Sequence, residues 1–341
     1  MMDYSTTAQA GHRAKSEPSF DFEADYRSLT TGVGYRLMDE RLVVRMVGDD
    51  RVSFLNGMCS NDIKQLVPGM IVQALLLTEH AHVLADLYVW AKKEALLLET
   101  DRTLWPNARA QIEKCLVADD VEIEELPTMA VIDIEGPQAG RAVSAIGAES
   151  AAALEPWHHR ESGRVDIANL PRFGRPAFTV IAEAADTAEF AAGLNRAGAT
   201  LEIREVSAEA LDVIRIENGV PRVGVDTTEK TIALEARLQS AISFNKGCYV
   251  GQETIERATA RGALKKRLFG LRLQGARVPE ANASVLLEGK EVGRVTSACL
   301  SPRLGVLGLG ILHHSAWNVG AQVTINDSQG EIKAEVSELP F

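Results

Sequence analysis

The sequence predicts an α+β fold that ends in a small β-barrel. Between residues 20 and 262, segments with helical periodicity alternate with short aliphatic runs typical of strands. From residue 268 the composition shifts to short Val, Leu and Ile runs separated by Gly, which favours a barrel or sandwich. A chain of 341 residues is long enough for more than one domain. We therefore expect a disordered tail over 1–19, an α+β module over 20–262 and a barrel over 263–341.

The α+β module is expected to have three parts, at about 20–126, 127–206 and 207–262. In the first part we expect a short helix at 20–29, a strand at 37–47 and an antiparallel meander from the runs 71–78, 82–91 and 95–100. From residue 105 onward, helices are expected at 105–116, 137–148 and 187–197, and strands at 121–126, 130–134 and 177–182. This order indicates a small α/β layer.

One acidic residue lies among large apolar residues in the middle strand of the meander. Side chains alternate along a strand, so Asp86, Tyr88 and Trp90 share a face. A carboxylate there either reaches solvent or has a partner, because a lone buried charge is costly. Asp86 is therefore a candidate site residue.

The segment 154–176 has no regular pattern, although it contains His158 and His159. Adjacent histidines do not make a zinc site without a third ligand at a standard spacing. We expect no metal site here.

A helix is predicted from Ser207 to Asn218, because Ser207 is a good N-cap and Gly219 and Pro221 end the pattern. On it, Glu217 lies beside the apolar stripe. A negative charge in the last helical turn is disfavoured by the helix dipole. Glu217 is thus either an exposed glutamate or a functional one.

The segment 245–253 reads Asn-Lys-Gly-Cys-Tyr-Val-Gly-Gln-Glu and predicts a tight loop that exposes Cys248. Lys246 nearby would favour the thiolate. A small buried cysteine in a turn is the alternative, since free cysteine is commonly a core residue. Cys59, Cys115 and Cys299 lie in a capped turn, a helical pattern and a barrel segment, so we expect them to be packing residues.

The net charge of −11 argues against general nucleic-acid binding, which needs basic stripes. The run 257–267 is the exception, with five Lys and Arg and no acid. It predicts a solvated face or an anion site. The four cysteines form no Cys-x-x-Cys pair, which favours a reducing cytoplasm over a disulfide framework. No apolar run approaches the roughly 20 residues of a membrane span, and no signal peptide is expected.

The loop around Cys248 resembles the Lys-Gly-Cys-Tyr-x-Gly-Gln-Glu signature of the YgfZ family of folate-binding proteins, which are related to the glycine cleavage T-protein, an aminomethyltransferase. Further similarity lies in Arg51-x-x-Phe54-Leu55-x-Gly57 followed by Asn61-Asp62, and in Arg215-Ile-Glu217-x-Gly219. The resemblance runs from about residue 30 to the end, with gaps in the middle third.

The resemblance implies a two-part folate-binding module of the T-protein type, a C-terminal β-barrel, and tetrahydrofolate or a derivative as cofactor. Glu217 would contact the pterin ring, whose adjacent amide and amine donors match one carboxylate. Asp86 and Tyr88 would line the same pocket, and Arg257 and Arg261 would hold the folate tail.

The implied role is support of iron–sulfur cluster assembly or repair, with client or assembly proteins as partners. Cys248, Lys246 and Asp86 would be the catalytic residues.

Two alternatives stay open. An aminomethyltransferase is one, although T-proteins carry Asp-Asp-Leu where this chain has Ala85-Asp86-Leu87. A non-catalytic folate-binding scaffold is the other.

Overall fold

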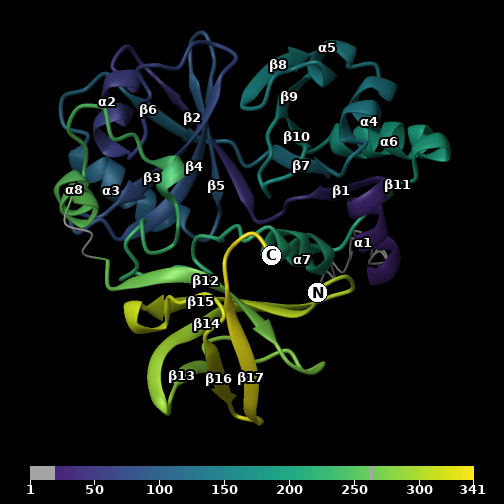
Figure 1. Cartoon of the computed structure of the whole chain (residues 1–341). Coiled ribbons are helices and arrows are strands. Elements are labelled where there is room, and N and C mark those ends of the chain that lie inside the picture. The colour runs from purple at the N-terminus through teal and green to yellow at the C-terminus, as the bar shows by residue number, and fades with distance from the viewer. Residues whose placement is uncertain (1–19, 261–263) are drawn as a thin grey trace, which may run out of the picture.

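The computed structural model describes residues 20–260 and 264–341. Two β-sheets lie side by side above a closed β-barrel, and helix α7 runs between the three layers (Figure 1). This architecture confirms the predicted α+β class with a terminal barrel. The expected disordered tail over 1–19 lies outside the described residues.

The first sheet has the strand order β3-β4-β5-β2-β6 and is antiparallel throughout. Two helices, α2 and α3, pack their apolar side chains on one face of it. The other face turns toward the second sheet and carries Tyr88 and Trp90. The meander predicted over residues 71–100 is therefore confirmed. The elements are β2 (Arg41–Val47), α2 (Arg51–Met58), β3 (Ile71–Leu77), β4 (Val83–Ala91), β5 (Leu96–Asp101), α3 (Trp105–Cys115) and β6 (Glu122–Glu125).

The second sheet has the order β11-β1-β7-β10-β9-β8, and its only parallel pair among the described strands is β1 with β11. The predicted α/β layer is thus a largely antiparallel sheet with helices on one face. The segment 154–176, predicted to be irregular, contains two of its strands. The elements are β1 (Val33–Leu37), β7 (Met129–Glu135), α4 (Ala139–Ala145), α5 (Glu149–Ala152), β8 (His158–Ser162), β9 (Val165–Asn169), β10 (Ala177–Glu183), α6 (Thr187–Leu201) and β11 (Ile203–Glu205).

The barrel closes in the order β12-β15-β14-β13-β16-β17 around a core of Val, Leu, Ile and Phe side chains. Glycines at positions such as Gly308 and Gly310 let neighbouring strands approach closely. The elements are β12 (Lys266–Leu273), β13 (Ser284–Leu287), β14 (Lys290–Ser301), β15 (Gly305–His313), η2 (His314–Ala316), β16 (Gln322–Asp327) and β17 (Gly330–Ser337).

Helices α1 (Phe22–Thr31) and α7 (Ala208–Glu217) fill the space between sheets and barrel. Ser207 is the N-cap of α7, and its hydroxyl accepts from the backbone N–H of Ala210 at 3.3 Å, as predicted. Gly219 ends the helix region with φ of +65°, a conformation that favours glycine. Two short elements complete the module, η1 (Gln239–Ala241) and α8 (Gln252–Ala260). None of the helices in the described ranges is long and apolar enough to cross a membrane.

Candidate functional site

A cavity of about 320 Å³ lies where the two sheets meet α7 and the loop that follows it. Strand β4 contributes Asp86 and Tyr88, and the segment around β8 and β9 contributes Trp157, Arg172 and Phe173. The volume is within the range of about 300–1,000 Å³ that small-molecule sites have. The cavity is therefore the candidate binding site of this chain.

One wall of the cavity is aromatic. The rings of Tyr88 and Trp157 are nearly parallel, at 13°, with centroids 6.3 Å apart, and Phe173 lies on the same cavity. On Tyr88, the guanidinium carbon of Arg172 lies 4.3 Å from the ring centroid. Burial raises the pKa of Tyr88 to about 12, so its hydroxyl is neutral and able to donate. Such a wall is suited to a flat ring system.

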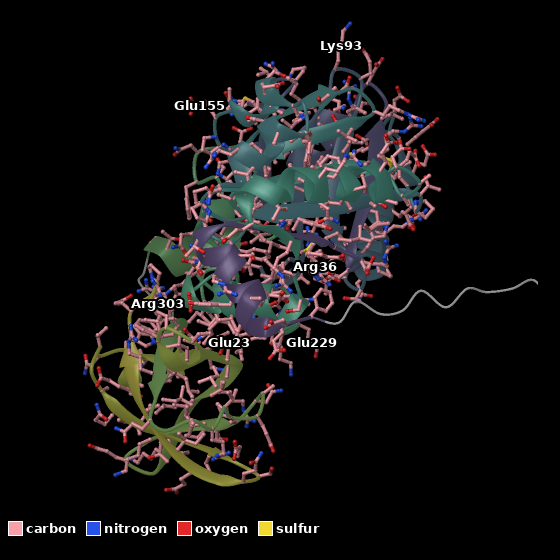
Figure 2. The ribbon with its side chains drawn as sticks, turned by 90° about the vertical axis from the view of Figure 1, so that its right-hand side faces the viewer. Glu23, Arg36, Lys93, Glu155, Glu229 and Arg303 are labelled. Carbon is pink, nitrogen blue, oxygen red and sulfur yellow. The ribbon has the colours of Figure 1, made fainter. Side chains whose placement is uncertain are left out.

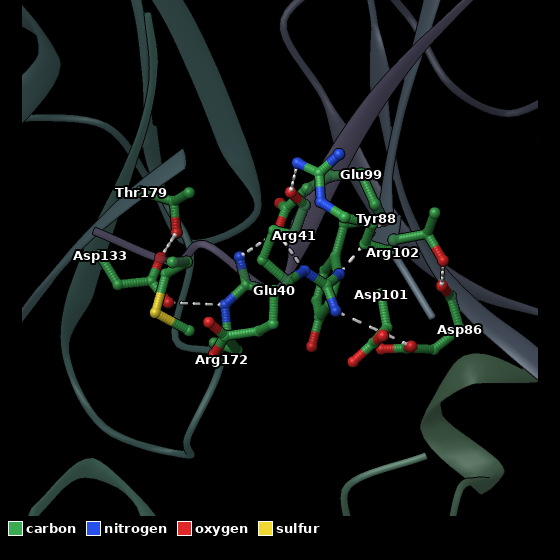
Figure 3. Close-up of polar contacts among 12 residues, drawn as sticks. Glu40, Arg41, Asp86, Tyr88, Glu99, Asp101, Arg102, Asp133, Arg172 and Thr179 are labelled. Atoms are coloured by element: carbon green, nitrogen blue, oxygen red, sulfur yellow. Dashed lines mark hydrogen bonds and ion pairs between the residues drawn. The ribbon is translucent and has the colours of Figure 1, made fainter. Parts of the chain in front are cut away.

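Behind this wall, a buried charged network joins the two sheets (Figure 3). Arg172 donates from Nε to Oδ2 of Asp133 on β7 at 2.8 Å, and from Nη2 to Oε1 of Glu99 on β5 at 2.7 Å. Arg41 on β2 donates from Nε to the same Glu99 oxygen at 2.8 Å. Thr179 donates to the second oxygen of Asp133 at 2.6 Å. The network therefore ties both sheets to the cavity wall.

The charges around Glu99 favour the ionised form of its carboxyl group. Burial by itself would raise the pKa of this carboxyl, but Arg172 and Arg41 hold the pKa below its usual value. Burial lowers the pKa of Arg172, and Asp133 and Glu99 more than reverse this, so the pKa stands well above the ordinary arginine value. Nη1 of Arg172 is buried and has no hydrogen-bond partner within the described residues.

Asp86 lines the cavity. Its carboxylate forms a long ion pair, with Oδ1 3.9 Å from Nη1 of Arg41. A pair at that distance leaves lone pairs of the carboxylate for other donors. Ala85 packs on the opposite face of β4, in the core with α2 and α3. The change from Asp-Asp-Leu to Ala85-Asp86-Leu87 therefore removes no acid from the cavity of this chain.

Glu217, predicted to line the same pocket as Asp86, is not among the residues that line this cavity. Its carboxylate accepts from the hydroxyls of Tyr26 at 2.7 Å and Ser301 at 2.5 Å, and lies 3.4 Å from Nη2 of Arg303. Arg303 lies where the barrel meets the module (Figure 2). Successive residues of a helix turn by about 100°, so Glu217 points away from the face of α7 that carries Arg215 into the cavity lining.

The tail site predicted at Arg257 and Arg261 stays a prediction, and the structure describes only the first of the two arginines. Arg257 lies on α8, has its guanidinium 3.8 Å from Glu253, and is not part of the cavity lining. Arg261 lies outside the described residues. Arginines do reach the cavity from other segments, and sequence reasoning missed them: Arg36, Arg41, Arg172, Arg215, Arg222 and Arg237. Among them Arg222 is half-exposed, and its ion pair with Asp101 is long, at 3.9 Å.

The loop before α8 exposes Cys248, as predicted. Gly251 has φ of +88°, and a Cβ there would lie 2.7 Å from the carbonyl oxygen of Thr78, so this position requires glycine. Cys248 is not among the residues that line the cavity. The thiol and the cavity are therefore separate sites.

The hydrogen bonds of Lys246 go to residues other than Cys248. Its Nζ donates to the backbone carbonyls of Asn56, Cys59 and Asn61 at 2.6, 2.8 and 2.6 Å. An ammonium group has three protons, so these bonds use its whole donor capacity. Burial lowers the pKa of Lys246. Lys246 anchors the loop to the end of α2.

The other cysteines divide into two classes. Burial raises the pKa of Cys59 to about 11 and that of Cys299 to about 12, so both are packing thiols, as predicted. Cys115 is exposed on α3, so the expectation that it packs is wrong. Within the described residues, no three His, Cys, Asp or Glu side chains cluster as metal ligands do.

The two-sheet module followed by a closed barrel is the architecture to compare with known proteins. Residues 20–246 match the model of the GCVT N-terminal domain, and residues 266–341 match that of the glycine cleavage T-protein C-terminal barrel domain. The chain therefore belongs to the glycine cleavage T-protein family.

Individual relatives agree with this assignment. A chloroplast protein of Arabidopsis thaliana that is named as a transferase is 27% identical over 309 residues, which cover 87% of this chain and 68% of that protein. An aminomethyltransferase of Geobacillus kaustophilus is 26% identical over 314 residues, covering 88% and 84% of the two chains. The crystal structure of the glycine cleavage system aminomethyltransferase T from Bartonella henselae shares the fold, with a TM-score of 0.86, 20% identity and coverage of 94% and 89%.

Replacing Arg172 with Met should destabilise the protein by about 3–5 kcal/mol, because Glu99 and Asp133 would stay buried without their main partner. Urea unfolding at neutral pH measures this. Arg45→Met is the control, since Arg45 and Glu124 form an exposed pair, worth about 0–1 kcal/mol. Equal losses for the two variants would contradict the role of Arg172.

The depressed pKa of Glu99 predicts a pH dependence of stability. The unfolded carboxyl titrates near about 4.3, and the folded one lower. Ionised Glu99 thus contributes stability that is complete above the unfolded pKa and is lost as pH falls through the folded pKa. The stability difference between wild type and Glu99→Gln should be largest near neutral pH and shrink from about pH 5 downward. A difference that stays constant down to pH 3 would speak against it.

Proposed function

We propose that this chain binds tetrahydrofolate or a derivative in the cavity between its two sheets. The observation that carries the proposal is the joint presence of Asp86, the Tyr88–Trp157 wall and the guanidinium group of Arg172 at one cavity. A pterin ring is flat, has adjacent N–H donors and has a carbonyl acceptor. A ring wall, a carboxylate and a guanidinium suit these three features.

The residues that hold the folate would include the predicted Asp86 and Tyr88, together with arginines that were not predicted. Asp86 would accept from the ligand's N–H groups, and Arg172 would donate to an acceptor. The half-exposed Arg222 is better placed than Arg257 to meet the carboxylates of a folate tail, because it lies on the cavity and its pairing with Asp101 is weak. Folate, when bound, supplies one-carbon chemistry.

We further propose that the bound folate and Cys248 together support assembly or repair of iron–sulfur clusters in client proteins, in the cytoplasm. Thiolates are the protein ligands of such clusters. Cys248 is exposed while its loop is fixed by Lys246, so the thiol is accessible to a second protein at a defined position. Accessibility and fixed position are what support this role.

An aminomethyltransferase is the second candidate, and the orientation of β4 favours it, because Asp86 faces the cavity and the substitution at Ala85 does not affect it. Both candidates use the same folate cavity. Only the first requires Cys248. Turnover of an aminomethyl-lipoyl carrier protein at the rate of a T-protein control would favour the transferase.

Asp86→Asn should weaken tetrahydrofolate binding about 10- to 100-fold, since hydrogen bonds to a charged group are worth about 1.5–3 kcal/mol. Anaerobic isothermal titration calorimetry measures the affinity. Glu124→Gln, on the exposed strand β6, is the matched control and should bind like wild type. Unchanged affinity of the Asp86 variant would remove this carboxylate from the site, and a wild type that binds no tetrahydrofolate would refute the proposal.

Cys248→Ser should leave the unfolding free energy and the folate affinity unchanged, because the thiol is exposed and outside the cavity. The variant should nevertheless fail to restore iron–sulfur enzyme activity in cells that lack the protein. Cys115→Ser, which alters the other exposed thiol, should restore it fully. Full rescue by the Cys248 variant would confine the function to the folate cavity.

A further inference from the structure

The segment 338–341 lies against the back of one cavity wall. Gly219 is part of the cavity lining, and a Cβ at this glycine would lie 2.7 Å from Cβ of Leu339. Beside it, the backbone N–H of Phe341 donates to the carbonyl of Glu217 at 3.0 Å. The segment therefore supports the end of α7 where the chain turns into the cavity.

A second cavity-lining residue is held by the same segment. Arg237 lies on the cavity with φ of +59°, a conformation that costs energy for a residue other than glycine. Its guanidinium donates from Nε to the carbonyl of Leu268 on β12 at 2.7 Å and from Nη2 to Glu338 at 2.9 Å. These bonds hold the side chain against the barrel and help to maintain the backbone conformation.

The segment is itself fixed to the barrel. A Cβ at Gly270 on β12 would lie 2.7 Å from Cε1 of Phe341, so the ring packs directly on that strand. The guanidinium carbon of Arg272 lies 5.3 Å from the centre of the same ring. Leu339 and Phe341 both pack against the central core that includes Tyr88. The barrel thus reaches two positions of the cavity through one short segment.

We infer that the segment Glu338–Phe341 positions the cavity wall and so sets its affinity for a small ligand. The wall after α7 is a loop, and a loop that is ordered before binding loses less conformational entropy when the ligand binds. Leu339, Phe341 and Glu338 supply that order from the side opposite the ligand. They are positioning residues, since none of them lines the cavity. The choice of tetrahydrofolate as the ligand rests on the proposed function; the ordering of the wall does not.

Hydrogen exchange of the ligand-free protein tests the ordering directly. Leu339→Ala should speed exchange of backbone amides in residues 216–223, and Glu338→Gln in 235–241. Leu339→Met, which keeps the packing, should exchange like wild type. Asp327→Asn is the control. It removes the charge of an ion pair within the barrel domain, between Asp327 and Arg277 at 2.6 Å, and should leave the exchange rates of both segments unchanged. Unchanged exchange in the first two variants, or an equal increase in the Asp327 variant, would overturn the inference.

Calorimetry with tetrahydrofolate tests the consequence for affinity. Leu339→Ala should bind about three- to tenfold more weakly, and Glu338→Gln about threefold more weakly, whereas Leu339→Met and Asp327→Asn should match wild type. Faster exchange with unchanged affinity would overturn the link to binding. If wild type binds no tetrahydrofolate, the proposed function fails, and the exchange experiment still decides whether the segment orders the wall.

Discussion

The guanidinium of Arg172 is the group on which the arrangement of the module depends. It connects Asp133 of one sheet with Glu99 of the other and covers the ring of Tyr88 between them. Burying charges is costly, and the cost is offset only where geometry and hydrogen bonding are good. Arginine suits this position because its planar fork offers several donors in fixed directions. Arg172 therefore helps to fix the relative position of the two sheets, and with it the shape of the cavity.

The Arg215-x-Glu217 motif fixes the module to the barrel. Arg215 donates to Asp226 at 2.7 Å and to Ser297 on β14 at 2.9 Å, while Glu217 accepts from Ser301 at the end of the same strand. Two residues on different faces of one helix turn thus contact the barrel in separate networks. The motif marks a domain junction, and of its two charged residues only Arg215 lines the cavity.

Local sequence signals predicted the elements whose periodicity is strong and left out those set by tertiary contacts. The meander with Asp86 and Tyr88, the cap at Ser207 and the exposed loop around Cys248 were all predictable from alternation, capping and glycine positions. The hairpin of β8 and β9 was not, because its first strand is the polar run His158–Ser162 at the sheet edge. A turn glycine, Gly163 with φ of +63°, was the available signal.

Missing that hairpin also hid the site residues Trp157 and Arg172, which flank it. The absence of Glu217 from the cavity lining has a different reason: a motif specifies spacing, whereas the helix phase decides which way a side chain points. Lys246 shows the same limit. Its nearness to Cys248 in sequence suggested a pair, but the free carbonyls at the end of α2 offer an ammonium group better partners.

The cavity and the thiol loop are distinct sites on one continuous segment. Ser240 lines the cavity, and a few residues later the N–H of Ser243 donates to the carbonyl of Ser60 at 2.9 Å, where the loop begins. The hydroxyl of Ser60 donates to Ala241 between them. Because the segment is held at each of these points, its course from the cavity wall to Cys248 is fixed. A protein that recognises the loop therefore meets a surface whose position is set by the same contacts that shape the cavity.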